Sequence, residues 1–331
     1  RPIIGWHDPN FGVRFDDYME AVEAAAPAGR MRHIAESSLS LLSEPHLKRL
    51  QQNGFKAILP GIESWFDLGN KSKTRNTGME KVRQVADHVN MILRYIPYIQ
   101  TNFVVGMDGD AGPEPFELTK RFLDLAPGAF PAYSLLSAFG RAAPMNLDYQ
   151  RAGRLLPFPF HFLNNNHAMN VKPLNYGWVE FYDRLVDLSR YSFSWRAIAR
   201  RIPATPTMIP KWMNVVRAVS SEGFGRIKYH TTIRQLLDSD KSVRAYMEGE
   251  TTVLPEFYHN RIRNELGSLS QWLPEGALDH DPNAYLKSTT EAVPLVHMAS
   301  KPAAGTRRPA AVASGPVAAT LAVAHAPPPV N

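Results

Sequence analysis

The chain of 331 residues contains no cysteine. This absence excludes disulfide bridges, thiolate zinc sites, cysteine nucleophiles and cysteine-ligated iron–sulfur clusters built from its own residues. Other catalytic signatures are missing as well, because the eleven histidines form no H-E-x-x-H pattern and no serine stands in a G-x-S-x-G turn. We therefore expect no metal-binding residues in this chain, and the sequence leaves its catalytic residues unidentified.

Long apolar runs and a strong charge imbalance are missing too. No stretch approaches the ~18 apolar residues of a membrane span, and no basic segment precedes an apolar run at the N-terminus, so we expect a cytoplasmic protein without a membrane span. Lys and Arg (37) exceed Asp and Glu (31), but residues 301–331 hold three basic residues and no acid, which leaves +3 on the remainder. Nucleic-acid binding depends on many clustered cations, so no nucleic-acid partner is expected.

Up to residue 145, short β-like apolar runs alternate with helical patterns. This alternation predicts an α/β fold with a parallel sheet and helices outside it. Helices are expected over about residues 44–53, after the capping box that begins at Thr77, and over residues 115–125. The predicted strands are Ile3–Trp6, Met31–Ala35, Phe55–Leu59, Tyr98–Val105 and Ala132–Ala138.

Beyond residue 145 the pattern changes to helical pieces separated by Pro-rich and Asn-rich loops. Residues 301–331 hold ten Ala and six Pro with no aromatic residue, so this segment has too little to bury and is expected to be disordered. We predict three parts: residues 1–145 with the strands, a mostly helical accessory region over residues 146–299, and a tail over residues 300–331. The helices expected in the second part are Gly177–Leu188, Phe193–Arg201, Pro210–Ser221 and Pro255–Leu266.

Polar or small residues follow each predicted strand. In parallel α/β barrels the carboxyl ends of the strands meet at one mouth, so these residues are expected to converge there. Taken singly, Glu63 could equally be an ordinary loop acid, and Asp8 before Pro9 an ordinary turn. The candidates are Asp8, Asn10, Glu36, Glu63, Ser64, Gly106 and Asp108.

The motifs at these strand ends, in this order and about 30 residues apart, resemble those of radical S-adenosylmethionine (SAM) enzymes, in particular the group that often carries an N-terminal cobalamin-binding domain. The resemblance covers residues 3–145 and extends more loosely to about residue 290. It implies an incomplete (β/α)6 TIM-like barrel of parallel strands. The motifs are Trp6-His7-Asp8-Pro9-Asn10-Phe11-Gly12, Glu36-Ser37-Ser38, Gly61-Ile62-Glu63-Ser64 and Thr101-Asn102-Phe103-Val104-Val105-Gly106-Met107-Asp108.

The resemblance also implies cofactors and partners. In this family SAM binds the open iron of a 4Fe-4S cluster held by a C-x-x-x-C-x-x-C loop, and cobalamin is a further candidate cofactor. That loop is absent here, so we expect the cluster to be ligated upstream of this chain and the chain alone to be inactive. A small-molecule substrate and an electron-donor protein are the implied partners, and generation of a 5′-deoxyadenosyl radical for modification of an unknown substrate, with methylation as one outcome, is the implied reaction.

The implied cofactor contacts follow the motifs. Glu63 and Ser64 match the position that contacts the ribose or methionine part of SAM, and the segment from Phe103 to Gly106 matches the strand that flanks its adenine. Asp8 and Asn10 match the strand end near the methionine amine, although the Gly-Gly-Glu of many relatives is replaced here. Glu36 and Asp108 are expected to face the same cavity. The alternative is a non-catalytic barrel that binds a nucleotide-like ligand or a protein partner.

The composition of the tail generates a first prediction. Deleting residues 301–331 should leave the melting temperature unchanged within error, because the segment offers almost no large apolar group for burial. Thermal denaturation followed by circular dichroism measures this. A drop of several degrees would show that the segment docks on the folded part.

Overall fold

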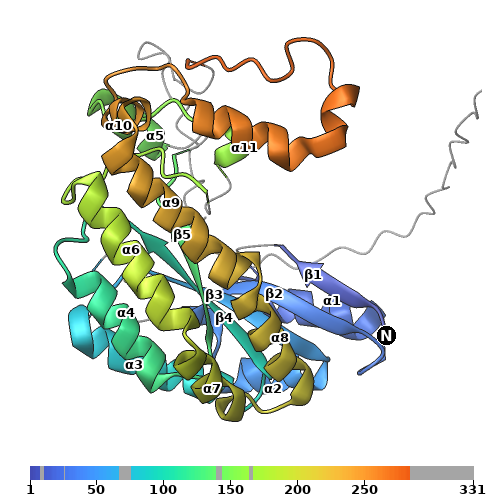
Figure 1. Ribbon diagram of the computed structural model, residues 1–331. Helices are drawn as coiled ribbons and strands as arrows, with labels where there is room; N and C mark the ends of the chain where they lie inside the picture. Colours follow the sequence, from blue (N-terminus) through green and yellow to red (C-terminus); the bar gives the residue numbers. More distant parts are fainter. Residues whose placement is uncertain (8–10, 26, 67–75, 139–143, 164–166, 284–331) are drawn as a thin grey trace, which may run out of the picture. The chain divides into compact units, whose positions relative to one another are not determined.

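The computed structural model describes residues 1–7, 11–25, 27–66, 76–138, 144–163 and 167–283. Within them five parallel strands form one sheet in the order β1-β2-β3-β4-β5 (Figure 1). The predicted α/β class is therefore confirmed, whereas closure into a barrel stays a prediction. The strands are β1 (Ile3–Trp6), β2 (Arg32–Ser38), β3 (Phe55–Glu63), β4 (Tyr98–Val105) and β5 (Phe130–Leu135).

Three strands differ from their predicted bounds. β2 begins at Arg32 and continues to Ser38, three residues past the predicted end at Ala35. β3 continues four residues past Leu59, because Pro60, which looks like a strand terminator, pairs with Ser37 of β2. β5 begins at Phe130, which pairs with Gln100, and ends at Leu135 rather than at Ala138. The carboxyl end of β3 therefore lies inside the sheet rather than in a loop.

Four helices follow the first four strands and pack on one face of the sheet. Consecutive parallel strands with right-handed crossovers place their connecting helices on the same side, and neighbouring helices here lie side by side. Their apolar stripes are buried, as the periodicity predicts. They are α1 (Phe15–Ala25), α2 (Glu44–Gln52), α3 (Gly78–Ile92) and α4 (Glu114–Leu125).

The described residues after 144 are mostly helical, and α6 joins them to the sheet layer by packing against α4 and α9 (Figure 1). Helices α5, α9 and α10 were not anticipated, nor was α1. Short 3-10 turns span residues 39–41, 160–162 and 267–272, and a π turn spans residues 221–225. The helices are α5 (Pro144–Arg151), α6 (Trp178–Phe193), α7 (Trp195–Ala204), α8 (Met208–Val219), α9 (Arg226–Ser239), α10 (Lys241–Glu248) and α11 (Glu256–Leu266).

None of the helices in the described part of the chain is both long and apolar enough to cross a membrane. Residues 1–291 form one compact unit. The predicted tail lies outside the described residues, so its disorder stays a prediction.

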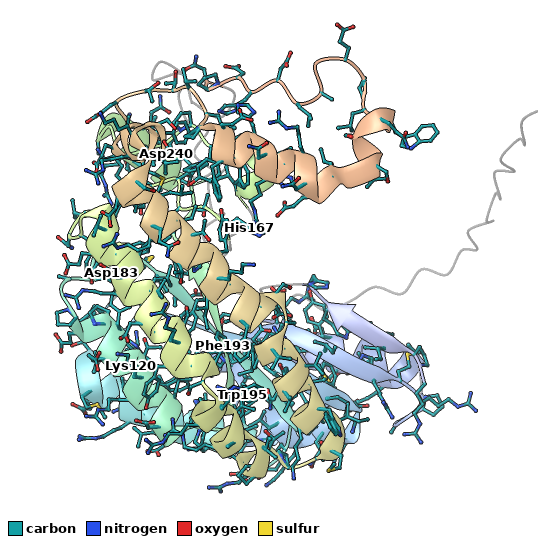
Figure 2. The ribbon with its side chains drawn as sticks, in the orientation of Figure 1. Lys120, His167, Asp183, Phe193, Trp195 and Asp240 are labelled. Carbon is teal, nitrogen blue, oxygen red and sulfur yellow. The ribbon has the colours of Figure 1, made fainter. Side chains whose placement is uncertain are left out.

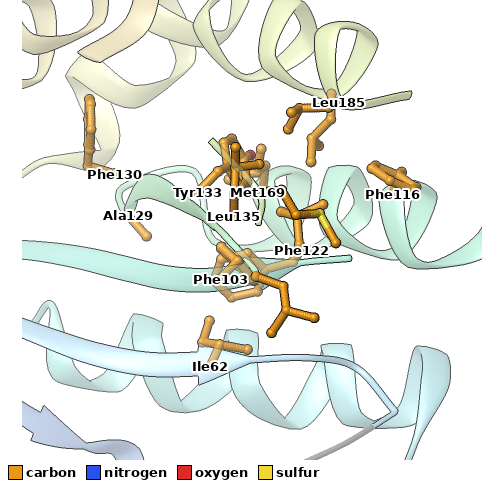
Figure 3. Close-up of a cluster of buried hydrophobic side chains, with 14 of the residues drawn as sticks. Ile62, Phe103, Phe116, Phe122, Ala129, Phe130, Tyr133, Leu135, Met169 and Leu185 are labelled. Atoms are coloured by element: carbon orange, nitrogen blue, oxygen red, sulfur yellow. The ribbon is translucent and has the colours of Figure 1, made fainter. Parts of the chain in front are cut away.

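The core lies between the sheet and the helices α4 and α6 (Figure 3). Phe103 of β4 lies 5.6 Å from Phe122 of α4 and 5.8 Å from Tyr133 of β5, measured between ring centroids. Two hydroxyl groups pair at the edge of this core, since the Tyr133 hydroxyl lies 2.6 Å from the Ser192 hydroxyl of α6. Dense aromatic packing therefore joins both halves of the described chain.

This packing generates a second prediction, on α4. Phe122→Ala should lower the free energy of unfolding by about 3–5 kcal/mol, because it empties a fully enclosed site. Leu125→Ala, on the same helix but 43% exposed, should cost less than about 1 kcal/mol. Chemical denaturation measures both values, and similar losses would contradict the placement of this core.

Candidate functional site

The carboxyl ends of the five strands lie along one edge of the sheet. Ligand sites of parallel α/β proteins form at this edge, because loops of several strands meet there. The strands end at Trp6, Ser38, Glu63, Val105 and Leu135. The predicted site residues lie within three residues of these ends, except that Asp8 and Asn10 lie outside the described residues.

The strand register shows which side chains share a face at this edge. Residues paired in a parallel ladder point to the same side, and alternate residues point to opposite sides. Gly61 pairs with both Ser38 and Asn102, so these three lie on one face, together with Glu36. This face, opposite α1–α4, is called the inner face below, and it carries the polar groups.

Glu63 has the unusual backbone of this edge. Its φ is +66°, the one positive value of a non-glycine residue in the described part of the chain. The register of β3 and β4 shifts between Gly61 and Glu63. A left-handed conformation costs a non-glycine residue on the order of 1–2 kcal/mol, and such strain concentrates at functional sites.

Gly61 provides the space for the Glu63 side chain. A Cβ atom on Gly61 would lie 2.3 Å from the Oε1 atom of Glu63, so the carboxylate lies directly over the glycine. Since Gly61 belongs to the inner face, the strained backbone turns the Glu63 carboxylate onto that face. A side chain at position 61 would therefore displace the Glu63 carboxylate from this place.

Ser64 belongs to a buried polar network instead. Its hydroxyl donates to Asp110 at 3.4 Å and accepts the Phe66 amide at 3.1 Å. Its carbonyl accepts the Lys81 ammonium at 2.5 Å, and Lys81 is only 1% exposed. The Ser64 hydroxyl is therefore committed to holding the ends of β3 and β4 together behind Glu63.

Asp108 forms an ion pair rather than an open ligand contact. Arg154 donates to both of its carboxylate oxygens, at 3.0 and 2.6 Å. This hydrogen-bonded pairing raises the pKa of the Arg154 guanidinium above its usual value. Asn175 donates to the backbone carbonyls of Asp108 and Asp110, so the loop after β4 is anchored by residues beyond position 150.

Phe103 and Gly106 are enclosed by the core. Phe103 is 3% exposed and points toward the helices, because it alternates with Asn102 along β4. Gly106 has a φ of +89°, and a Cβ atom there would lie 2.7 Å from the Met169 methyl carbon. Contacts of a ligand with these two positions are thus restricted to the backbone.

Glu36 shares the inner face with the Glu63 carboxylate. Its Oε1 atom lies 3.2 Å from Nδ1 of His7, and both side chains are accessible. Farther along this face, Gln100 donates to Asn102 at 2.7 Å. The inner face at the strand ends therefore combines two carboxylates, a histidine and two amides, a set suited to hydroxyl and amine groups.

Two cavities lie beside the sheet. A cavity of about 20 Å³ behind Glu63 and Ser64 has room for about one water molecule. A cavity of about 340 Å³ is lined by seven residues, including His167, Arg226, Tyr229 and Arg261. Arg226 donates to the Tyr133 carbonyl at 2.6 Å, which places this cavity beside β5, and His167 lies next to α9 (Figure 2). Burial lowers the pKa of His167.

The described residues do not fit a 4Fe-4S cluster. The sequence has no cysteine, and among the described residues no group of three or more His, Asp and Glu side chains could hold a metal ion.

Sequence reasoning missed Lys81 and Arg154. The burial of Lys81 could have been predicted, because it stands four residues before Val85 and therefore on the apolar stripe of its helix. The role of Arg154 could not have been predicted from neighbouring residues, since its partner Asp108 lies 46 residues away. Gly61 was read as part of a motif, whereas its role depends on the fold around Glu63.

Comparisons with known proteins do not identify a family for this chain. No protein-family model and no curated protein matches the chain. A solved structure, the radical S-adenosylmethionine methyltransferase TsrM from Kitasatospora setae with cobalamin and a [4Fe-4S] cluster bound, is similar at 18% identity and a TM-score of 0.35. The similarity covers 52% of this chain, which spans about a third (32%) of the length of that one. A TM-score this low does not establish a shared fold.

Proposed function

We propose that this chain forms the SAM-binding portion of a radical SAM enzyme, with the cysteines of the iron–sulfur cluster outside the sequence given. The order of the strand-end motifs supports this proposal, as does the parallel sheet that brings them to one edge. The observation that carries it is the Glu63 carboxylate, turned onto the inner face by a strained backbone over Gly61.

Each inner-face group has a defined task in this proposal. The Glu63 carboxylate accepts hydrogen bonds from the ribose hydroxyls or the amine of SAM, and charge-assisted hydrogen bonds of this kind are strong. Glu36 and His7 form a second polar pair on the same face. The network of Ser64, Lys81 and Asp110 positions Glu63 without contacting the ligand.

The substrate occupies the cavity of about 340 Å³ beside β5. Its size falls in the range of small-molecule sites. The cavity neighbours the last strand, whereas Glu36 and Glu63 lie on β2 and β3, so cofactor and substrate bind beside different strands of the same sheet. Cobalamin has no residue assigned to it here.

The strain at Glu63 generates a third prediction. Glu63→Gly should leave the protein at least as stable as the wild type, with a gain of up to about 1 kcal/mol, because glycine tolerates a positive φ. Glu36→Gly, on ordinary β2 backbone, should lose about 0.5–1 kcal/mol. Urea denaturation measures both, and a clear loss at position 63 would argue against the left-handed backbone.

The fourth prediction concerns SAM binding. Glu63→Gln keeps the shape of the side chain and removes its charge, so the dissociation constant for SAM should rise by roughly tenfold or more, as expected for loss of a charge-assisted hydrogen bond of about 1.5–3 kcal/mol. Glu117→Gln, an exposed change on α4, should leave it unchanged. Isothermal titration calorimetry on the chain, and on a longer form that carries the cysteines, measures both.

Three outcomes separate the alternatives. A selective effect at Glu63 supports the proposal. Equal effects at Glu63 and Glu117 would remove the special role of Glu63. Adenosine could instead bind as tightly as SAM and show the same dependence on Glu63. The methionine part of SAM would then contribute nothing to the affinity, and the chain would be a barrel that binds a nucleotide-like ligand.

A further inference from the structure

Large apolar side chains are exposed together on the helical hairpin of α7 and α8, residues 195–219, called the α7–α8 hairpin below. Trp195 is 67% exposed, Trp212 64% and Ile209 62%. Figure 2 shows Trp195 at the start of α7. Soluble proteins expose single apolar residues everywhere, but a contiguous patch marks an interaction surface. The exposed set is Trp195, Ile202, Met208, Ile209, Trp212, Met213, Val216 and Val219.

The patch on α8 is a regular stripe. Ile209, Trp212, Met213 and Val216 stand at i, i+3, i+4 and i+7, which is one helix face. From Ile209 to Val219 this face is about 15 Å long at 1.5 Å per residue. A ridged stripe of this length matches a helix of about three turns, because helices pack ridges into grooves.

The orientation of α8 is set by its opposite face. Asn214 is 1% exposed and donates to Thr205 at 3.0 Å. Arg217 donates to the Tyr98 hydroxyl at 2.6 Å and lies 4.2 Å above the Phe130 ring. The helix cannot rotate its apolar stripe inward without breaking these contacts, so the exposure is built into the fold.

The stripe continues into an apolar groove of about 460 Å³. Met208, Ile209 and Met213 form one wall of this groove, and Ile34, Ala57 and Tyr98 of the inner face are among the residues of the other. Tyr98 and Arg32 are the first residues of their strands. The groove therefore lies at the amino ends of the strands, opposite the candidate SAM site.

Cations predominate around this surface. From residue 188 to residue 221 the sequence holds six Arg and Lys residues and no acid, although Arg201 is buried and Arg200 and Arg217 form ion pairs with Asp124 and Glu222. Arg32 and Lys56 line the groove. Within the described residues, no side-chain hydrogen bond or ion pair involves Arg32, Lys56, Arg196 or Lys211. A partner with carboxylates beside its apolar groups would complement this surface.

We propose that the α7–α8 hairpin and the adjoining groove bind an amphipathic, acidic helix of a partner polypeptide. The helix lays its apolar face along the α8 stripe, inserts one or two side chains into the groove and meets the cations with Glu or Asp. A membrane is disfavoured because a flat bilayer does not fill a concave groove. A second copy of the same surface is disfavoured because its cations would face identical cations.

The test uses a synthetic 16-residue helical peptide with Leu at i, i+3, i+4 and i+7 positions and Glu at most of the others. The control peptide has Lys in place of every Glu. Calorimetry and the shift of the tryptophan emission measure binding, and the Trp212→Phe variant identifies the part of the shift that comes from Trp212. The acidic peptide should bind at least tenfold more tightly than the basic one, and its affinity should fall with added salt.

Protein variants locate the binding surface. Ile209→Glu and Val216→Glu should each weaken binding of the acidic peptide at least tenfold, because they place a like charge on the stripe. Leu174→Glu, at a position 58% exposed outside the groove, should have no effect. All three positions are exposed, and circular dichroism melting confirms that the variants fold.

Other results overturn the proposal. Equal binding of both peptides, or no binding of the acidic one, removes the acidic helix as the occupant. A concentration-dependent dimer in sedimentation velocity that Ile209→Glu dissociates would assign the surface to a second copy. Cosedimentation with phosphatidylglycerol vesicles that Ile209→Glu abolishes would assign it to a membrane. Failure of this test leaves SAM binding at the other end of the sheet unaffected.

Discussion

The consecutive parallel pairing of the five strands is the constraint on which the other features depend. It requires each connection to cross back over the sheet, and the right-handed crossover places α1–α4 on one face. It also brings all the strand ends to one edge and leaves the opposite, inner face free of these four helices. The candidate SAM site lies at the carboxyl ends of the strands on that inner face, and the apolar groove lies at their amino ends.

Much of this arrangement could be predicted from local sequence patterns. Apolar runs and helical periodicity identified all five strands and most helices, because those patterns report burial directly. The end of β3 could not be predicted, since Pro60 normally terminates a strand and here pairs with Ser37. Helix α9 follows a glycine-containing π turn and mixes polar with apolar residues, so its sequence gave no clear start.

The site was less predictable than the fold, because position at a strand end does not reveal which way a side chain points. Glu36 and Glu63 reach the inner face, whereas Phe103, one residue after Asn102, points to the helices. Asp108 was chosen for its place in the chain, yet its carboxylate pairs with Arg154. Such long-range partners are invisible to any pattern of neighbouring residues.

The buried ammonium of Lys81 has a consequence for chemistry in solution. Its nitrogen contacts the Ser64 carbonyl, and the side chain is enclosed between α3 and the strand ends. An amine-specific reagent can reach it only when this corner of the protein opens, and local opening need not await global unfolding. The labelling rate of Lys81, divided by that of exposed lysines such as Lys56, therefore measures how often the strand-end region opens locally.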